Sequence, residues 1–169
     1  MEITNSTAND IAAIFALYDD AMAYQKKVFH KQWQGFAPSL VETEVAEKRQ
    51  WKIVVDGQIA CIFALTFEDP AIWGEKSNEP AIYIHRIVTN SAFRGGNYVP
   101  HIVAWAKDYA KSIGKQYIRM DTWGDNQRLI DYYQACGFAF LGLTEELNSA
   151  SLPKHYSAIQ LSLFEIALF

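Results

Sequence analysis

Apolar residues recur every three or four positions in four segments of the chain, and this spacing predicts amphipathic helices. Thr7 and Asp10 stand before the first segment with the spacing of a capping box. Gly114 follows the third segment, where glycine commonly ends a helix. The predicted helices cover residues 10–26, 39–48, 99–113 and 126–136.

Other segments are rich in β-branched and aromatic residues and predict strands. These strands cover residues 51–55, 58–67, 81–89, 117–122, 138–143 and 157–169. Asp56 and Gly57 separate the first two strands and form a strong hairpin signal. Segments 68–80 and 145–156 are predicted to be loops. Strands come first and then alternate with helices, which is typical of an α/β domain on a mixed sheet.

The composition agrees with a globular domain. Of the 169 residues, 50% are hydrophobic and 14% aromatic, which excludes an intrinsically disordered chain. The formal net charge of −4, from 15 Lys and Arg against 19 Asp and Glu, argues against a nucleic-acid partner. The sequence contains neither a run of membrane-spanning length nor a signal-peptide pattern. We therefore expect one domain over residues 1–169, in the cytoplasm and without a membrane partner.

The cysteines and histidines indicate neither a disulfide framework nor a metal site. Cys61 and Cys136 are each alone in their region of the chain. The four histidines are scattered, and none is spaced with a cysteine as metal ligands are. The sequence therefore predicts no bound metal.

A glycine-rich junction precedes the third predicted helix. Arg94, Gly95, Gly96 and Asn97 lie between the end of a strand and the start of that helix. Such a junction presents backbone N–H groups and the positive end of a helix dipole to a phosphate. The alternative is an ordinary turn that contains two glycines, and these residues alone leave both interpretations open.

The fourth predicted helix carries a second group of candidate residues. Asn126 is a suitable N-cap, and Gly137 ends the helix before Phe138 begins a new strand. Tyr133, seven residues after Asn126, has a phenol that can donate a proton to a leaving group. The alternative for Tyr133 is a packing role, as for Tyr132 beside it.

In this order and spacing, the two stretches resemble the GNAT superfamily of N-acetyltransferases, which transfer acetyl from acetyl-CoA to an amine. The resemblance covers residues 81–143 well and the rest of the chain in outline. It implies an α/β fold with a mixed, mostly antiparallel sheet of about six to seven strands. It also implies about four flanking helices and a splayed central strand pair, with the strand at 81–89 as the fourth of the sheet.

The resemblance assigns roles around acetyl-CoA, the implied co-substrate. Tyr133 would protonate the departing CoA sulfur, and the backbone N–H near Val88 would polarise the acetyl carbonyl. Arg94 opens the implied pyrophosphate loop, while Asn97 and Val99 stand where the family has small residues. The implied cofactor-binding residues are Ile87, Val88, Arg94, Gly95, Gly96, Asn97, Tyr98, Val99 and Asn126.

The general base has several candidates. Asp121 lies five residues before Asn126, where some family members carry a glutamate proposed as base. His85 has a side chain whose ordinary pKa suits proton transfer. Asp121 is equally suited to ordering the turn that follows its strand, and His85 to a structural hydrogen bond. A water relay without either residue, or through Glu68 or Glu79, also stays open.

The resemblance implies an acceptor pocket with an aromatic wall. Glu68, Asp69 and Glu79 would attract a cationic amine to it. The alternative places the aromatic residues in the core or in a subunit contact. The aromatic residues are Tyr24, Phe29, Trp33, Phe36, Trp73, Trp123 and Tyr156, and the substrate-binding set is Trp33, Phe36, Glu68 and Trp123.

The leading hypothesis is an acetyl-CoA-dependent N-acetyltransferase that acts on a small-molecule or peptide amine. One alternative is a non-catalytic CoA-binding or regulatory domain that retains the fold. Another is an interaction domain that binds no CoA. The resemblance also allows a homodimer.

Overall fold

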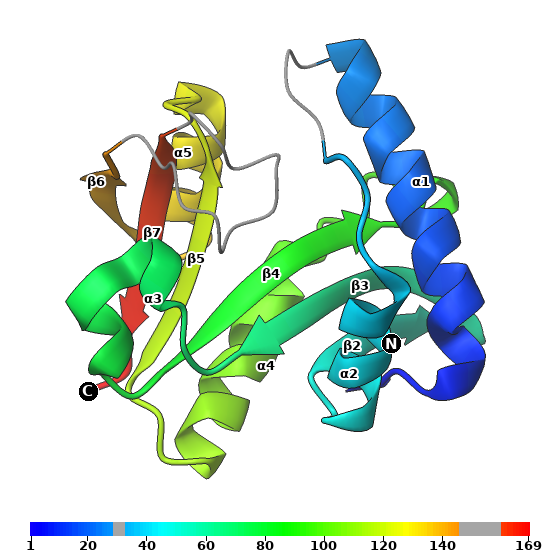
Figure 1. The fold of residues 1–169 in the computed structure, drawn as a ribbon, viewed down its shortest axis with the longest axis horizontal. Helices are drawn as coiled ribbons and strands as arrows, with labels where there is room; N and C mark the ends of the chain where they lie inside the picture. Colours follow the sequence, from blue (N-terminus) through cyan, green and yellow to red (C-terminus); the bar gives the residue numbers. More distant parts are fainter. Residues whose placement is uncertain (29–32, 146–159) are drawn as a thin grey trace. The chain divides into compact units, whose positions relative to one another are not determined.

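The computed structural model describes residues 1–28, 33–145 and 160–169 (Figure 1). Its strands form a seven-stranded sheet in the order β1-β2-β3-β4-β5-β7-β6. The strands are β1 (Glu2–Asn5), β2 (Gln50–Val55), β3 (Gln58–Thr66), β4 (Ala81–Thr89), β5 (Tyr117–Trp123), β6 (Ala139–Leu143) and β7 (Leu161–Ala167). The α-helices of the described residues are α1 (Ile11–Val28), α2 (Pro38–Ala46), α3 (Pro70–Trp73), α4 (Val99–Ser112) and α5 (Gln127–Ala135).

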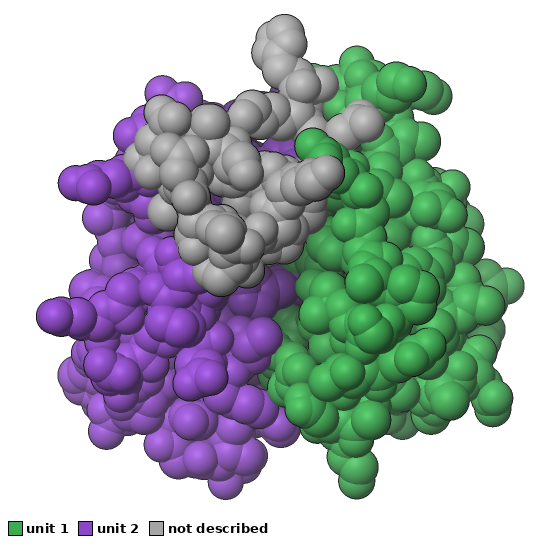
Figure 2. All heavy atoms as spheres, viewed as in Figure 1, with its two compact units in different colours: residues 1–65, 86–98 green, residues 66–85, 99–169 purple. Residues whose placement is uncertain are grey.

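These elements confirm the predicted fold class. The β1–β2, β2–β3, β5–β7 and β6–β7 pairs are antiparallel, and β4 pairs with β5 in parallel. The chain divides into two compact units, coloured in Figure 2. Unit 1 comprises residues 1–65 and 86–98, and unit 2 comprises residues 66–85 and 99–169. The expectation of a single domain stays a prediction.

In unit 1, β2 and β3 form the predicted hairpin. Asp56 and Gly57 have φ values of 50° and 76°, and Val55 pairs with Gln58. Two successive positive φ angles are those of the tight hairpin turn whose twist matches the flanking strands. The strand β1, which the sequence analysis does not predict, lies antiparallel to β2.

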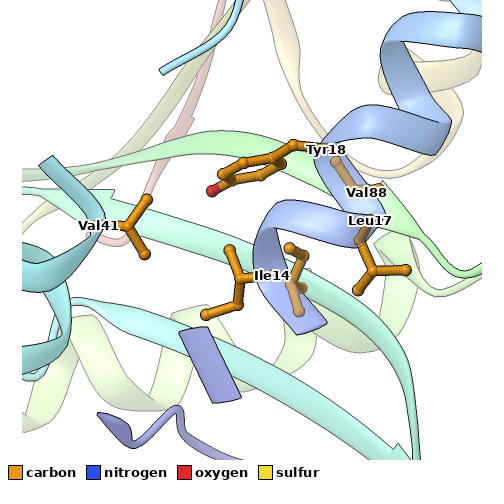
Figure 3. Close-up of a cluster of buried hydrophobic side chains, with 6 residues drawn as sticks. Ile14, Leu17, Tyr18, Val41 and Val88 are labelled. Carbon is orange, nitrogen blue, oxygen red and sulfur yellow. The ribbon is translucent and has the colours of Figure 1, made fainter. Parts of the chain in front are cut away.

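The core of unit 1 lies under α1 and α2 (Figure 3). Ile14, Leu17 and Tyr18 share one face of α1 and pack with Val41 of α2 and Val88 of β4. The spacing of three and four residues along α1 therefore brings apolar side chains to one face of the helix, as the sequence pattern predicts.

A buried ion pair lies beside this core. The guanidinium of Arg86 bonds the carboxylate of Glu44, which is 2% exposed. Arg86 also donates from Nε to the Tyr18 hydroxyl at 3.2 Å. Arg86 has a φ of 51° within β4, a backbone conformation that costs energy for a residue with a side chain. The ion pair and the hydroxyl contact stabilise that conformation.

In unit 2, β5 pairs along its whole length with β7, and β7 continues the sheet to β6 (Figure 1). The register between β4 and β5 joins Ala81–Tyr83 to Tyr117–Arg119. Beyond Arg119, β5 continues to Trp123 along β7. The parallel pairing of β4 with β5 thus covers three residue pairs, and the splay of the central strand pair stays a prediction.

The four predicted helices and six predicted strands are present among the described residues, with ends that differ by a few residues. Residues 157–159 of the last predicted strand and 146–156 of the predicted loop lie outside the described residues. Segment 68–80 is not a plain loop, because α3 and a 3-10 helix at Gly74–Asn78 occupy most of it. Cys61 and Cys136 are free thiols, as predicted. Among the described residues, the helices are all too short or too polar to cross a membrane.

Candidate functional site

The helix α5 has the cap that the sequence predicts. The side chain of Asn126 accepts hydrogen bonds from the backbone N–H groups of Arg128 at 3.1 Å and Leu129 at 3.2 Å. At the other end Gly137 has a φ of 107°, and Phe138 donates from its backbone to the carbonyl of Tyr133 at 3.1 Å. Both ends of the helix that carries Tyr133 are therefore held by local bonds.

The ring of Tyr133 is half-buried in an aromatic cluster of unit 2. Its centroid lies 5.3 Å from that of Phe164 on β7 and 6.2 Å from that of Phe138. Tyr132 contacts it at 5.3 Å along the same helix. These contacts give the phenol a defined position on α5, which a proton donor needs.

The glycine-rich loop of unit 1 follows a short 3-10 helix, Ser91–Phe93. Asn97 has a φ of 52°, a left-handed conformation that asparagine adopts more readily than most residues. A Cβ on Gly96 would lie 2.5 Å from a ring carbon of Tyr98. A side chain at position 96 would therefore require the Tyr98 ring to shift. The Gly96 N–H donates to the carbonyl of Phe93 at 3.1 Å, so this amide is already used within the loop.

Two neighbours of this loop differ in exposure. Arg94 is exposed, and its guanidinium carbon lies 4.7 Å from the ring centroid of Tyr24 on α1. This cation–π contact places a positive charge beside the loop. Val99 begins α4 and is 9% exposed. Its branched side chain is therefore a packing residue, in contrast to the small residue that the family pattern has there.

Val88 and Ile87 follow Arg86 on β4. The Val88 side chain belongs to the core of unit 1 and is 6% exposed, while Ile87 is half-buried. The role that the resemblance implies for Val88 uses its backbone N–H, and a buried side chain is compatible with that role.

The two base candidates of the sequence analysis lie together in unit 2, with a third residue that it treated only as a steering acid. Asp69 precedes α3, His85 lies on β4 and Asp121 on β5. One side-chain ligand atom from each of the three lies within 4.8 Å of the others. The His85 Nε2 is 3.5 Å from Oδ2 of Asp69 and 3.2 Å from Oγ1 of Thr66.

Burial governs the electrostatics of this cluster. Oδ2 of Asp69 and Oδ1 of Asp121 are buried, and neither has a hydrogen-bond partner among the described residues. Burial raises the pKa of Asp121 to about 7, and the charge of Asp69 adds to that increase. Burial likewise raises the pKa of Asp69 to about 6, against a backbone hydrogen bond from Ile72 that lowers it.

The same three side chains have the donor types of a divalent metal site. This grouping has no signal in the sequence, because the three residues are far apart in the chain and are not cysteine–histidine pairs. The absence of a metal therefore stays a prediction.

Glu79 has a partner of its own. Its Oε1 accepts from Nη2 of Arg119 at 2.7 Å, and Arg119 also donates to Glu165 at 2.8 Å. The charge of Glu79 is thus compensated, which weakens its expected part in attracting a cationic substrate. Glu68 is exposed.

The predicted aromatic wall divides between the two units. Trp33 and Phe36 pack against Tyr18 at the edge of the core of unit 1, with centroid distances of 6.1 and 5.1 Å. Trp123 packs against a cluster of unit 2 in which Trp73 is 5% exposed. Trp73 is therefore a core residue. Phe29 and Tyr156 lie outside the described residues.

Comparison with known proteins points in the same direction as these motifs. The sequence profile described as "Acetyltransferase (GNAT) family" matches residues 13–138. A curated protein of Bacillus subtilis (strain 168), the uncharacterised N-acetyltransferase YesJ, is 30% identical over 74 residues. That match covers 44% of this chain and 41% of YesJ, so the chain spans about two fifths of the relative's length.

Solved structures share the fold at lower identity. An acetyltransferase of the GNAT family from Listeria monocytogenes is 20% identical with a TM-score of 0.78, covering 98% of this chain and 94% of that one. The acetyltransferase yncA of Salmonella typhimurium, described with its cofactor acetyl-CoA, is 12% identical with a TM-score of 0.71. It covers 100% of this chain and 94% of that one.

Proposed function

The chain belongs to the acetyltransferase (GNAT) family, and we propose that it transfers the acetyl group of acetyl-CoA to a primary amine. In this reaction the amine nitrogen bonds the acetyl carbon and the carbon–sulfur bond breaks. The incoming ammonium must first lose a proton, and the departing thiolate must gain one. The site therefore has to supply an acid and a base.

Tyr133 is the proposed general acid, and its place on α5 is the observation that carries the proposal. Asn126 caps the start of the helix and Gly137 follows its end, as in the family motif. The tyrosine ring is held by Phe138 and Phe164. A tyrosine has an ordinary pKa of about 10, so its hydroxyl is protonated at neutral pH and can donate to the thiolate.

The proposed cofactor contacts come mainly from the loop between β4 and α4. Arg94 and the backbone of residues 95–99, apart from the Gly96 N–H that bonds Phe93, bind the pyrophosphate, supported by the left-handed turn at Asn97. The backbone N–H near Val88 polarises the acetyl carbonyl. Asn126 orients the cofactor, and Ile87 contacts it.

Asp121 and His85 are the proposed base, supported by their closeness in unit 2. The proposed acceptor contacts are Trp33, Phe36, Glu68 and Trp123, which suit an amine with an apolar or aromatic part. A small-molecule amine and a peptide amine both fit this description. A homodimer and a cytoplasmic location also stay predictions from the sequence.

The experiment measures thiol release from acetyl-CoA with a panel of amines, for the wild-type protein and two matched variants. Tyr133→Phe removes the proposed acid, and we expect it to lower kcat about 100-fold or more. Tyr132→Phe removes the neighbouring hydroxyl from the same helix and serves as the control. Equal turnover in the two variants would remove Tyr133 from the mechanism.

A non-catalytic CoA-binding domain is the alternative function. Calorimetry with acetyl-CoA, together with a thermal-unfolding scan, separates the possibilities. Ligand at 100 times its Kd stabilises a folded protein by ~2.7 kcal/mol. Binding without turnover of any amine would favour the alternative, and binding with turnover supports the enzyme.

A further inference from the structure

We propose that Asp69, His85 and Asp121 form one proton-holding cluster in which Asp69 is a positioning residue that sets the proton affinity of Asp121. The inference rests on the proposed amine acetylation, because it assigns to this cluster the proton that the acceptor amine loses. The sequence analysis considers Asp69 only as one of several surface acids near the substrate.

The geometry brings two carboxylates and an imidazole to one place from three separate elements of unit 2. Their ligand atoms lie within 4.8 Å of one another. The side chains of Asp69 and His85 are 13% and 18% exposed. Like charges this close, with little water between them, are unfavourable if both carboxylates are ionised.

Apart from His85, the basic side chains of the described residues form no recorded ion pair with either carboxylate. Arg119, two residues before Asp121, is engaged by Glu79 and Glu165. The ion pair recorded for Asp69 is with His85, and the residue opposite Asp121 on β7 is the apolar Leu163. The titratable groups recorded close to Asp121 among the described residues are thus Asp69 and His85.

A shared proton resolves the conflict. One proton on the carboxyl pair leaves a single negative charge, which the protonated oxygen and the imidazole can stabilise by hydrogen bonds. The raised pKa values of both carboxyls agree with this arrangement. Closely coupled acids titrate as a pair, so the proton belongs to the cluster.

The acceptor ammonium gives its proton to Asp121 of this cluster. When the cluster has lost its shared proton, an N–H bond of the acceptor ammonium breaks and the proton bonds a carboxylate oxygen of Asp121. The nitrogen keeps the electron pair and uses it to attack the acetyl carbon. Asp69 takes no part in bond making, but its negative charge makes Asp121 a stronger base at neutral pH.

The test is the pH profile of kcat/KM for Asp69→Asn. The amide keeps the size of the side chain and removes its charge, so the pKa of Asp121 falls. We expect the acidic limb of the profile to move down by about one pH unit. Glu75→Gln, an exposed residue of the following 3-10 helix, is the charge-matched control and leaves the limb in place.

A second measurement does not depend on turnover. The carboxyl carbon of Asp121, followed by NMR in the wild-type protein, should titrate with a midpoint near pH 7, and in Asp69→Asn the midpoint should fall. Acetylation with an unmoved acidic limb and an unmoved midpoint would overturn the inference while leaving the proposed function intact. Absence of acetylation for any amine, with the NMR shift present, would overturn the proposed function and retain the coupling of the two carboxyls.

A stoichiometric divalent metal in the purified protein would also overturn the inference. A bound cation would hold both carboxylates ionised, and no shared proton would remain. Metal analysis of the protein as purified measures this directly.

Discussion

Arg119 and Asp121 are both charged residues on one face of β5, yet their surroundings differ. The Arg119 side chain is fully buried and donates to Glu165, to Glu79, to the Lys76 carbonyl and to the Tyr83 hydroxyl. The buried Oδ1 of Asp121 has no hydrogen-bond partner among the described residues. Residues two apart in a strand point to the same side, so both face the elements packed there.

The difference separates a structural charge from a reactive one. Every nitrogen of Arg119 finds an acceptor, and its guanidinium also lies 4.9 Å from the ring centroid of Trp73. Such a group has a strong preference for its charged state and little freedom to exchange protons. Asp121 lies beside a second acid, and its two protonation states are close in free energy at neutral pH.

The largest expected effect is the loss of Arg119. Arg119→Met leaves Glu165 and Glu79 without their cation, and Glu165 is 16% exposed. Breaking a buried ion pair by removing one partner typically costs 3–5 kcal/mol, so we expect the free energy of unfolding to fall by about 3 kcal/mol. Urea unfolding measures it. Arg128→Met, on the exposed side of α5, is the control and should change stability by less than about 0.5 kcal/mol.

At high pH, Asp121→Asn should have a higher free energy of unfolding than the wild type. We expect this gain to be smaller than the loss caused by Arg119→Met. The wild-type carboxyl has a pKa near 7 in the folded state, against 3.8 as its ordinary value. Between these values the folded state binds the proton more tightly, so the stability that this group contributes is lost as pH rises through about 7. As pH rises, the free energy of unfolding of the wild type should fall relative to that of the variant by at most ~1.4 kcal/mol per pH unit.

The measurement is urea unfolding of both proteins from pH 5 to pH 8. Asp69 and His85 are present in both, so the difference reports the titration that Asp121 adds to the cluster. A difference that does not change with pH would mean that Asp121 titrates normally and that its contrast with Arg119 is wrong.

The smallest expected effect is that of Glu79→Gln. Glu79 is 41% exposed, and Glu165 remains as a carboxylate partner of Arg119. Partly exposed ion pairs contribute little, so we expect a loss of about 0.5 kcal/mol in unfolding free energy. A loss as large as that of Arg119→Met would show that Glu79, rather than the pair of acids, compensates the guanidinium.

Most helices and strands, and the capped helix that carries Tyr133, were predictable from the sequence because they depend on residues close together in the chain. The helix that carries Tyr133 has its cap at Asn126, and the hairpin at Asp56 has the conformation its residues favour. The strand β1 was missed because it is four residues long and shows little alternation. The helix α3 was missed because it has four residues and is held by contacts such as Asp69 N–H to Ser77 Oγ at 2.6 Å.

The sequence by itself indicated the α/β class through the periodicity of its segments, and the family through the resemblance of residues 81–143 to the family's motifs. It also named His85 and Asp121 as separate candidates. The tertiary structure decided that they lie together with Asp69, because the parallel register of β4 and β5 and the position of α3 bring residues 69, 85 and 121 together. Burial, which raises the pKa of both carboxyls, depends on that packing and has no local signature in the chain.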